Sequence, residues 1–287
     1  MGRRAFLCHQ RTRASDRRYY LGVMPLHIHD LVSSIDAMAP FTSAADWDSV
    51  GLQIGDPRRI LESTAVAHEL TDSVVDAAID RGVTLVVTYH PLVFRPLTSV
   101  TERPGPEGRV LALINAGVAV VAVHTNWDVA PGGTSDSLAT ALSLEDVAVF
   151  GTGGEERNHA SNPMEPIGRI GTFEGSVDGL VKAATDLGGI VRTTPLEDAS
   201  VRRVALLPGS GGSFVGAAAD AGADVLITGD ISHHDARHAL DRGMAIIDAG
   251  HAATERPGVR ALYAAVVDVV GSVTDLTEID ESPWEGG

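Results

Sequence analysis

The chain has 287 residues, of which 44% are hydrophobic, enough to bury the core of one large domain or two small ones. Its formal net charge of -16 disfavours general binding to the phosphate backbone of nucleic acids, and its single cysteine excludes intrachain disulfides and cysteine-based zinc sites. The only lysine, Lys182, follows no glycine-rich loop, which argues against a P-loop nucleoside triphosphatase. No apolar run reaches the roughly 20 residues of a membrane-spanning helix, so we expect a cytoplasmic protein without a membrane partner.

Residues 1–23 differ in charge from the rest of the chain. They hold six arginines and one aspartate, a net charge of +5, which leaves -21 for the remainder. The segment lacks the long apolar core of a secretory signal. We interpret it as a disordered leader or as an upstream start with Met24 as the working start, and a targeting peptide or a docking tail remains the alternative.

From Leu31 onward, helical and strand periodicities alternate, which is typical of an α/β fold. Residues 73–82, SVVDAAIDRG, predict a helix that stops at a glycine. Residues 83–90 form a continuous apolar run of strand length, as expected for a strand buried on both faces. A predicted helix over residues 109–117 and a second strand over residues 118–128 follow.

The same order of elements recurs in the second half of the chain. SVVDAAIDRG aligns with SFVGAAADAG at residues 213–222, with six identities at a constant offset of 140. A strand over residues 223–230, a helix over residues 232–243 and a strand over residues 244–255 follow in the same order. Each second strand ends in a histidine that an acidic residue follows four positions later, in the pairs His124/Asp128 and His251/Glu255. We interpret this repeat as a gene duplication that yields two pseudo-equivalent α/β lobes.

The repeat also predicts the domain boundaries. After the leader of residues 1–23, we expect the first lobe over residues 24–145. A connector, loop-like in composition around GTGGEERNHASNP, and the start of the second lobe occupy residues 146–200. The second lobe covers residues 201–287, and its C-terminal helix is free to return to the first lobe.

Four polar residues stand near the ends of the predicted strands: His90, Asp128, His251 and Glu255. Parallel strands bring their carboxyl ends to one edge of a sheet, so two paired lobes can bring these side chains together. Imidazole nitrogen and carboxylate oxygen suit zinc, iron or manganese. Taken singly, His90 could cap a helix and the i, i+4 pairs could lie on a helix surface. Polar residues recur at equivalent positions in the two halves of the repeat, and this recurrence favours a divalent-metal site.

The remaining histidines divide into two groups. His124 lies close to the predicted site, and His234 opens a helix beside the same edge, so both are candidate catalytic groups that could transfer protons. The neighbouring pair of His233 and His234 could equally be exposed polar residues. Six others lack a partner at a ligand spacing and are interpreted as structural or surface residues: His9, His27, His29, His68, His159 and His238.

Several ordered motifs resemble a known family, named after NGG-one-interacting factor three and also labelled dinuclear-metal-centre proteins or GTP cyclohydrolase I type 2 homologs. The matching strings are WDSVGLQIG (47–55), YHPLVF (89–94), HTNWD (124–128), GSGGSF (209–214), LITGDISHHDA (226–236) and DAGHAATE (248–255). The resemblance implies a two-lobed α/β fold, a toroidal homohexamer, and two metal ions per subunit between the lobes. By position, it places the family's ligands on His90, Asp128, His251 and Glu255.

One departure from the family pattern concerns Tyr89. The family has His-His-Pro at the end of the first strand, whereas this chain has Tyr89-His90-Pro91, so Tyr89 stands where the family has a further histidine ligand. We therefore expect one or two ions per subunit. One is held well by His90, Asp128 and Glu255, and a second is held more weakly by His251 and Glu255.

These features lead to two functional hypotheses. The first is a metal-dependent hydrolase that acts on a small nucleotide-like or phosphorylated substrate. A GTP cyclohydrolase activity is implied only by the family resemblance. The alternative is a non-catalytic, metal-stabilised ring that acts as a scaffold or regulatory binding protein. Metal-dependent turnover distinguishes the two.

Overall fold

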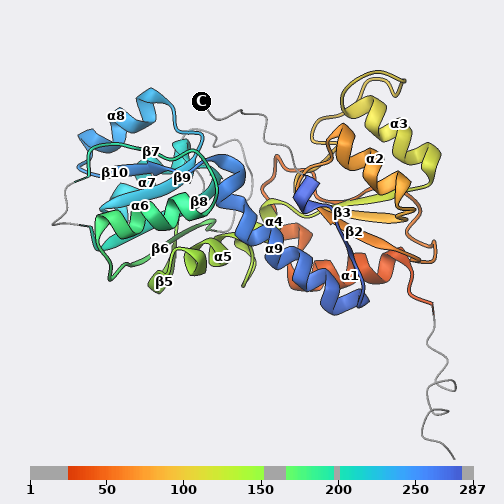
Figure 1. Ribbon diagram of the computed structural model, residues 1–287, viewed down its shortest axis with the longest axis horizontal. Coiled ribbons are helices and arrows are strands. Elements are labelled where there is room, and N and C mark those ends of the chain that lie inside the picture. The colour runs from red at the N-terminus through yellow and green to blue at the C-terminus, as the bar shows by residue number, and fades with distance from the viewer. Residues whose placement is uncertain (1–24, 152–165, 197–200, 280–287) are drawn as a thin grey trace, which may run out of the picture.

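The computed structural model describes residues 25–151, 166–196 and 201–279. Two α/β lobes, each with its own sheet, lie side by side (Figure 1). The predicted fold class of two α/β lobes is thereby confirmed. The predicted leader at residues 1–23 and most of the glycine-rich connector lie outside the described residues.

The first lobe is built on a five-stranded sheet in the order β1-β4-β3-β2-β11. Its central strands β2, β3 and β4 are parallel, β11 runs parallel to β2, and β1 is antiparallel to β4. The strand bounds are β1 Gly51–Ile54, β2 Thr64–Ala67, β3 Leu85–Thr88, β4 Ala119–Ala122 and β11 Thr274–Asp275. Helices α1 (Ile28–Met38) and α9 (His251–Val270) pack on one face, and α2 (Asp72–Asp80) and α3 (Pro106–Ala116) pack on the other.

The second lobe has a six-stranded sheet in the order β5-β6-β8-β9-β10-β7, with β8, β9 and β10 parallel. The strand bounds are β5 Glu145–Phe150, β6 Gly168–Thr172, β7 Arg192–Thr193, β8 Arg203–Ser210, β9 Val225–Gly229 and β10 Ala245–Asp248. Helices α5 (Thr134–Ala141) and α6 (Val177–Asp186) cover one face, and α7 (Val215–Asp220) and α8 (His233–Asp241) cover the other. Shorter helices complete the described chain: η2 Phe41–Ser43, α4 Thr125–Val129, η3 Gly212–Phe214 and η4 Thr277–Ile279.

The central strands form because their residues are apolar on both faces. In β3, Leu85 and Val87 pack into the core beneath α1 and α9, whereas Val86 points into the core beneath α2 and α3. The succession α2-β3-α3-β4 recurs as α7-β9-α8-β10, in the order that the repeated sequence predicts. Descent of the two lobes from one duplicated gene remains an inference from the sequence.

Helix α9 joins the two lobes and lies between them in Figure 1. Its residues Val259, Leu262 and Val266 are buried in the core of the first lobe. Near its start, Thr254 accepts a 2.9 Å hydrogen bond from the backbone N–H of Gly209, at the end of β8 in the second lobe. The first turns of α9 therefore stand at the junction of the two sheets. Among the described residues, no helix has both the length and the apolar composition that crossing a bilayer requires.

Candidate metal centre

Three histidines follow the three parallel strands of the first lobe. His68 comes directly after β2, His90 lies two residues beyond β3, and His124 lies two residues beyond β4. The strand register aligns Ala67 with Thr88 and Thr88 with Ala122, so the three carboxyl ends meet at one edge. The imidazole rings of His68 and His90 lie 4.9 Å apart between centroids, and those of His90 and His124 lie 5.5 Å apart.

Glu255 enters this edge from the second turn of α9 and is buried. One carboxylate oxygen, Oε2, lies 2.8 Å from Nε2 of His68 and 3.2 Å from Nε2 of His90. The other, Oε1, lies 3.0 Å from Nε2 of His251, one helical turn earlier on α9. The second nitrogen of His251, Nδ1, contacts Asp230 at 2.7 Å. A single buried carboxylate thus gathers two histidines that follow strands of the first sheet and one from α9.

The sequence pattern predicts Asp128 and Glu255 near strand ends, and the structure corrects this placement. Asp128 lies inside the short helix α4, and Glu255 lies inside α9. The turn before α9 contains Gly250, whose φ of 92° is a conformation that glycine adopts readily. His251 and Glu255 are therefore an i, i+4 pair on one face of a helix, where Glu255 is buried at the centre and the side chain of His251 remains 37% exposed.

The electrostatics of the cluster favour ionised Glu255. Burial raises the pKa of its carboxyl, but the charge of His90 and hydrogen bonds from His251 and His68 outweigh burial and hold it well below the usual range. Burial lowers the pKa of His251, but its contacts with Glu255 and Asp230 prevail and raise it to about 9.

The donor atoms fit a divalent ion. The ligand atoms of His68, His90 and Glu255 all lie within 4.8 Å of one another. Neighbouring donors around a tetrahedral zinc ion, bound at about 2.0–2.2 Å, stand roughly 3.3–3.6 Å apart. The separations of 2.8 and 3.2 Å between Oε2 of Glu255 and the two imidazole nitrogens are somewhat shorter, so a bound ion would move these donors slightly apart. The cluster can therefore hold a metal ion through two imidazoles and one carboxylate.

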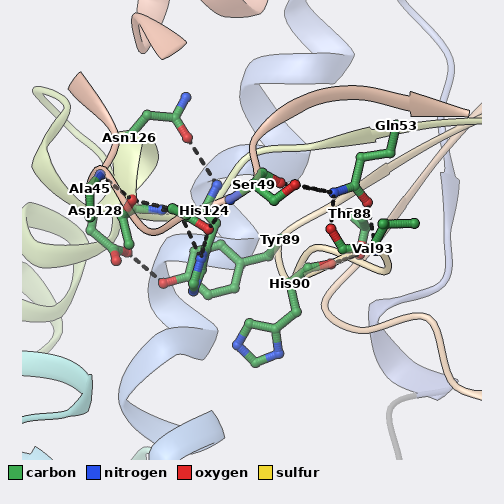
Figure 2. Close-up of polar contacts among 12 residues, drawn as sticks. Ala45, Ser49, Gln53, Thr88, Tyr89, His90, Val93, His124, Asn126 and Asp128 are labelled. Atoms are coloured by element: carbon green, nitrogen blue, oxygen red, sulfur yellow. Dashed lines mark hydrogen bonds and ion pairs between the residues drawn. The ribbon is translucent and has the colours of Figure 1, made fainter. Parts of the chain in front are cut away.

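Asp128 and Tyr89 form a pair beside this cluster. The phenolic O–H of Tyr89 donates a 2.5 Å hydrogen bond to Oδ1 of Asp128, and both side chains are buried (Figure 2). Burial, followed by the charge of Asp128, raises the pKa of Tyr89 well above its ordinary value. Burial also raises the pKa of Asp128 to about 6, although the charge of His124 and the bond from Tyr89 oppose it. Tyr89 therefore acts as a neutral hydrogen-bond donor.

The two candidate proton-transfer residues have different surroundings. His124 lies against Tyr89 and His90, and its Nδ1 is 3.0 Å from both carboxylate oxygens of Asp48. Burial lowers the pKa of His124, but the hydrogen bond and charge of Asp48 raise it overall. His234 is exposed at the start of α8, and the ring contact that the structure gives it is with its neighbour His233.

The structure thus brings His90, His251 and Glu255 into direct contact and sets Asp128 beside them through Tyr89. His68 and Asp48 are not among the site residues that the sequence pattern predicts. His68 closes a buried run, TAVAH, much as His90 follows the buried run LVVTY, and this similarity is an available signal. Asp72 even follows His68 four positions later, but the carboxylate that His68 meets in the structure belongs to Glu255, 187 positions distant in sequence, so no local spacing reveals the pair.

Comparison with known proteins agrees with the fold and with the motifs. The model of the family described as Duf34/NIF3 (NGG1p interacting factor 3) matches residues 26–279. A "GTP cyclohydrolase 1 type 2 homolog" of Streptomyces coelicolor is 34% identical over 256 residues, covering 85% of this chain and 86% of that protein. A protein of the same name from Lactococcus lactis is 33% identical over 232 residues, covering 79% and 86% respectively.

The solved structures show the same architecture. Staphylococcus aureus protein SA1388 superposes with a TM-score of 0.80 at 25% sequence identity, covering 92% of this chain and all of that one. HcgD from Methanocaldococcus jannaschii, at 24% identity and a TM-score of 0.74, shares the fold over 88% of this chain and 99% of its own. The match to the family model spans nearly the whole described chain and confirms the resemblance seen in the sequence motifs. The chain therefore belongs to the DUF34/NIF3 family.

Proposed function

We propose that this protein is a metal-dependent hydrolase that acts on a small nucleotide-like or phosphorylated substrate. The observation that carries the proposal is the buried carboxylate of Glu255, which three histidine nitrogens approach within 3.2 Å at the junction of the lobes. Such a convergence is costly to bury without a function, because each imidazole and the carboxylate lose hydration there. The Streptomyces coelicolor and Lactococcus lactis relatives described above bear the name GTP cyclohydrolase 1 type 2 homolog, which supports the same substrate class.

The proposed roles follow from the donor geometry. His68, His90 and Glu255 would hold the well-bound ion, whereas His251 and Asp128 would contribute to a second, weaker one. A bound zinc, iron or manganese ion would lower the pKa of a water molecule to about 7 and so supply a nucleophile. His124, whose Nδ1 lies 3.0 Å from both carboxylate oxygens of Asp48, would transfer a proton to a leaving group.

The alternative is a metal-stabilised scaffold without turnover, and one observation favours it. The hydroxyl of Tyr89 donates a 2.5 Å hydrogen bond to Oδ1 of Asp128. This carboxylate oxygen is therefore already hydrogen-bonded within the protein and is less available to coordinate a metal ion. Assembly as a homohexamer belongs to both proposals, and light scattering at micromolar concentration tests it directly.

The deciding experiment follows the loss of each nucleotide in a panel, by chromatography of substrate and products, with wild-type protein, with chelated protein, and with chelated protein to which zinc, iron or manganese is restored. A hydrolase loses activity on chelation and regains it with one of these metals, and Glu255→Gln fails to regain it. Metal that binds stoichiometrically without any turnover across the panel would support the scaffold instead.

A further inference from the structure

Two large aromatic side chains are exposed beside the metal centre. Trp47 is 54% exposed and Phe94 is 43% exposed, and their ring centroids lie 6.0 Å apart at 71°. Trp47 also lies 6.3 Å from the ring of His124, which in turn contacts His90. The two aromatic rings therefore lie next to the histidine cluster on its solvent side, and part of each ring surface is exposed to solvent.

The two loops that carry these rings are tied together by Gln53. Its Nε2 donates to the backbone oxygen of Ser49 at 2.9 Å and to that of Val93 at 3.0 Å, and its Oε1 accepts from the backbone N–H of Val93 at 3.0 Å (Figure 2). Ser49 lies two residues after Trp47, and Val93 directly precedes Phe94. One amide side chain thus fixes the relative position of both aromatic loops.

A second anchor holds the tryptophan loop to the metal centre. Asp48, next to Trp47, has a fully buried side chain that accepts hydrogen bonds from the hydroxyl of Thr125 at 2.5 Å and its backbone N–H at 3.1 Å. The same carboxylate contacts His124 at 3.0 Å. The exposed rings are therefore preorganised, which reduces the entropy lost when a ligand stacks on them.

From this arrangement we propose that Trp47 and Phe94 form a stacking platform for a flat heteroaromatic ring, such as a nucleobase, which stacks on the face of one side chain and meets the other, at 71° to it, edge-on. This inference rests on the proposed function, whose substrate it specifies. The platform holds the heteroaromatic ring of the ligand at the edge of the metal centre, while the polar remainder of the same ligand extends over His124 toward His90. Aromatic faces accept any base, so the platform would contribute affinity for a ring without selecting one base strongly. Gln53 acts as a positioning residue.

The test compares ligands that differ by the ring alone. Calorimetry on the metal-loaded, full-length protein measures binding of guanosine, adenosine, cytidine and uridine monophosphates, with ribose 5-phosphate as the ring-free reference. Trp47→Ala and Phe94→Ala should each weaken nucleotide binding about tenfold and leave ribose 5-phosphate unchanged. Gln53→Ala should show the same ring-dependent loss, which a general structural defect would not produce. Ile114→Ala, at a 54% exposed position on α3, is the control and should change neither ligand.

Three results would overturn the platform. Wild-type protein could bind no nucleotide more tightly than ribose 5-phosphate. The aromatic variants could weaken both ligands equally. Trp47→Ala could alter the oligomeric state in light scattering, which would make the pair an interface between copies of the chain. Because binding is measured without turnover, such failures leave the hydrolase proposal standing. Ring-dependent binding without any hydrolysis would count against the hydrolase proposal alone.

Discussion

At the scale of single residues, Glu255 organises the centre. A lone buried carboxylate would be expensive, and here three imidazole nitrogens compensate it through contacts of 2.8 to 3.2 Å. Neutral glutamine at this position would keep the shape of the side chain but would remove the negative charge that both the histidines and a cation require. The centre therefore depends on charge at Glu255 more than on packing.

His68 is the residue whose role the structure changes most. Replacing it with leucine removes one of three clustered donors while keeping a buried side chain of similar size. We expect His68→Leu to bind the tightly held metal at least roughly tenfold more weakly. Metal titration of chelated protein with a competing indicator measures this. His29→Leu, at an exposed histidine, is the matched control, and equal affinity in wild type and His68→Leu would remove His68 from the ligand set.

His251 predicts a dependence of stability on pH in metal-free protein. Its folded pKa of about 9 lies above the unfolded value near 6.5. A raised pKa contributes stability that is fully present below pH 6.5 and is lost as the pH rises through 9. Side-chain exposure of 37% weakens the effect through solvent screening.

The measurement is urea unfolding of chelated wild type and His251→Gln at pH 6 and pH 9.5. Wild type should lose more unfolding free energy between these two pH values than the variant, because only wild type carries the imidazole whose pKa is raised. Identical losses would show that the contacts with Glu255 and Asp230 do not favour the protonated ring.

At the scale of elements, α9 sets the distance between the lobes at its close approach to α5. A Cβ added to Gly258 would lie 2.4 Å from the Cα of Thr134, and the indole N–H of Trp127 donates to the carbonyl of Gly258 at 2.9 Å. The two helices can approach this closely because position 258 has no side chain. The same contact positions Glu255, one turn earlier on α9, against the first sheet.

Gly258→Ala should therefore destabilise the protein by about 1–3 kcal/mol, as overpacking does in a filled interior. Because α9 must shift to relieve the clash, metal affinity should fall as well, although no ligand is changed. Thermal unfolding and metal titration measure the two effects. Ala264→Leu adds bulk at an exposed position of the same helix and should leave both unchanged. An unaltered melting temperature in Gly258→Ala would contradict the proposed close contact.

The elements of the fold could be predicted from sequence because their signals are local. Apolar runs such as residues 85–88 and a glycine after a helix, such as Gly117, mark strands and helix ends without reference to distant parts of the chain. The sequence pattern predicts one strand through the start of α9, because the turn at Gly250 depends on a backbone angle that the residues DAGHAATE do not specify.

The site was predictable only in part, for a related reason. His251 and Glu255 carry a local i, i+4 spacing and were identified. His68 meets Glu255 only because the register of β2 and β3, together with the path of α9, brings the two side chains together. The bond from Tyr89 to Asp128 likewise joins two elements whose distance apart is set by the folded sheet.

At the scale of the whole molecule, the centre lies where α9 joins the first sheet and also contacts the second. His68 and His90 belong to the first sheet, and α9 carries His251 and Glu255 to them while also contacting β8 of the second. Metal binding should therefore stabilise the docking of the lobes, because an ion that binds only the folded arrangement adds its binding free energy to stability.

The proposed metal centre is tested most directly by elemental analysis of purified wild type and Glu255→Gln and by anomalous scattering from their crystals. We expect at least one zinc, iron or manganese ion per wild-type subunit, located between His68, His90 and Glu255, and its loss from Glu255→Gln with the fold retained. An ion bound elsewhere, or equal metal content in the two proteins, would contradict the proposed centre.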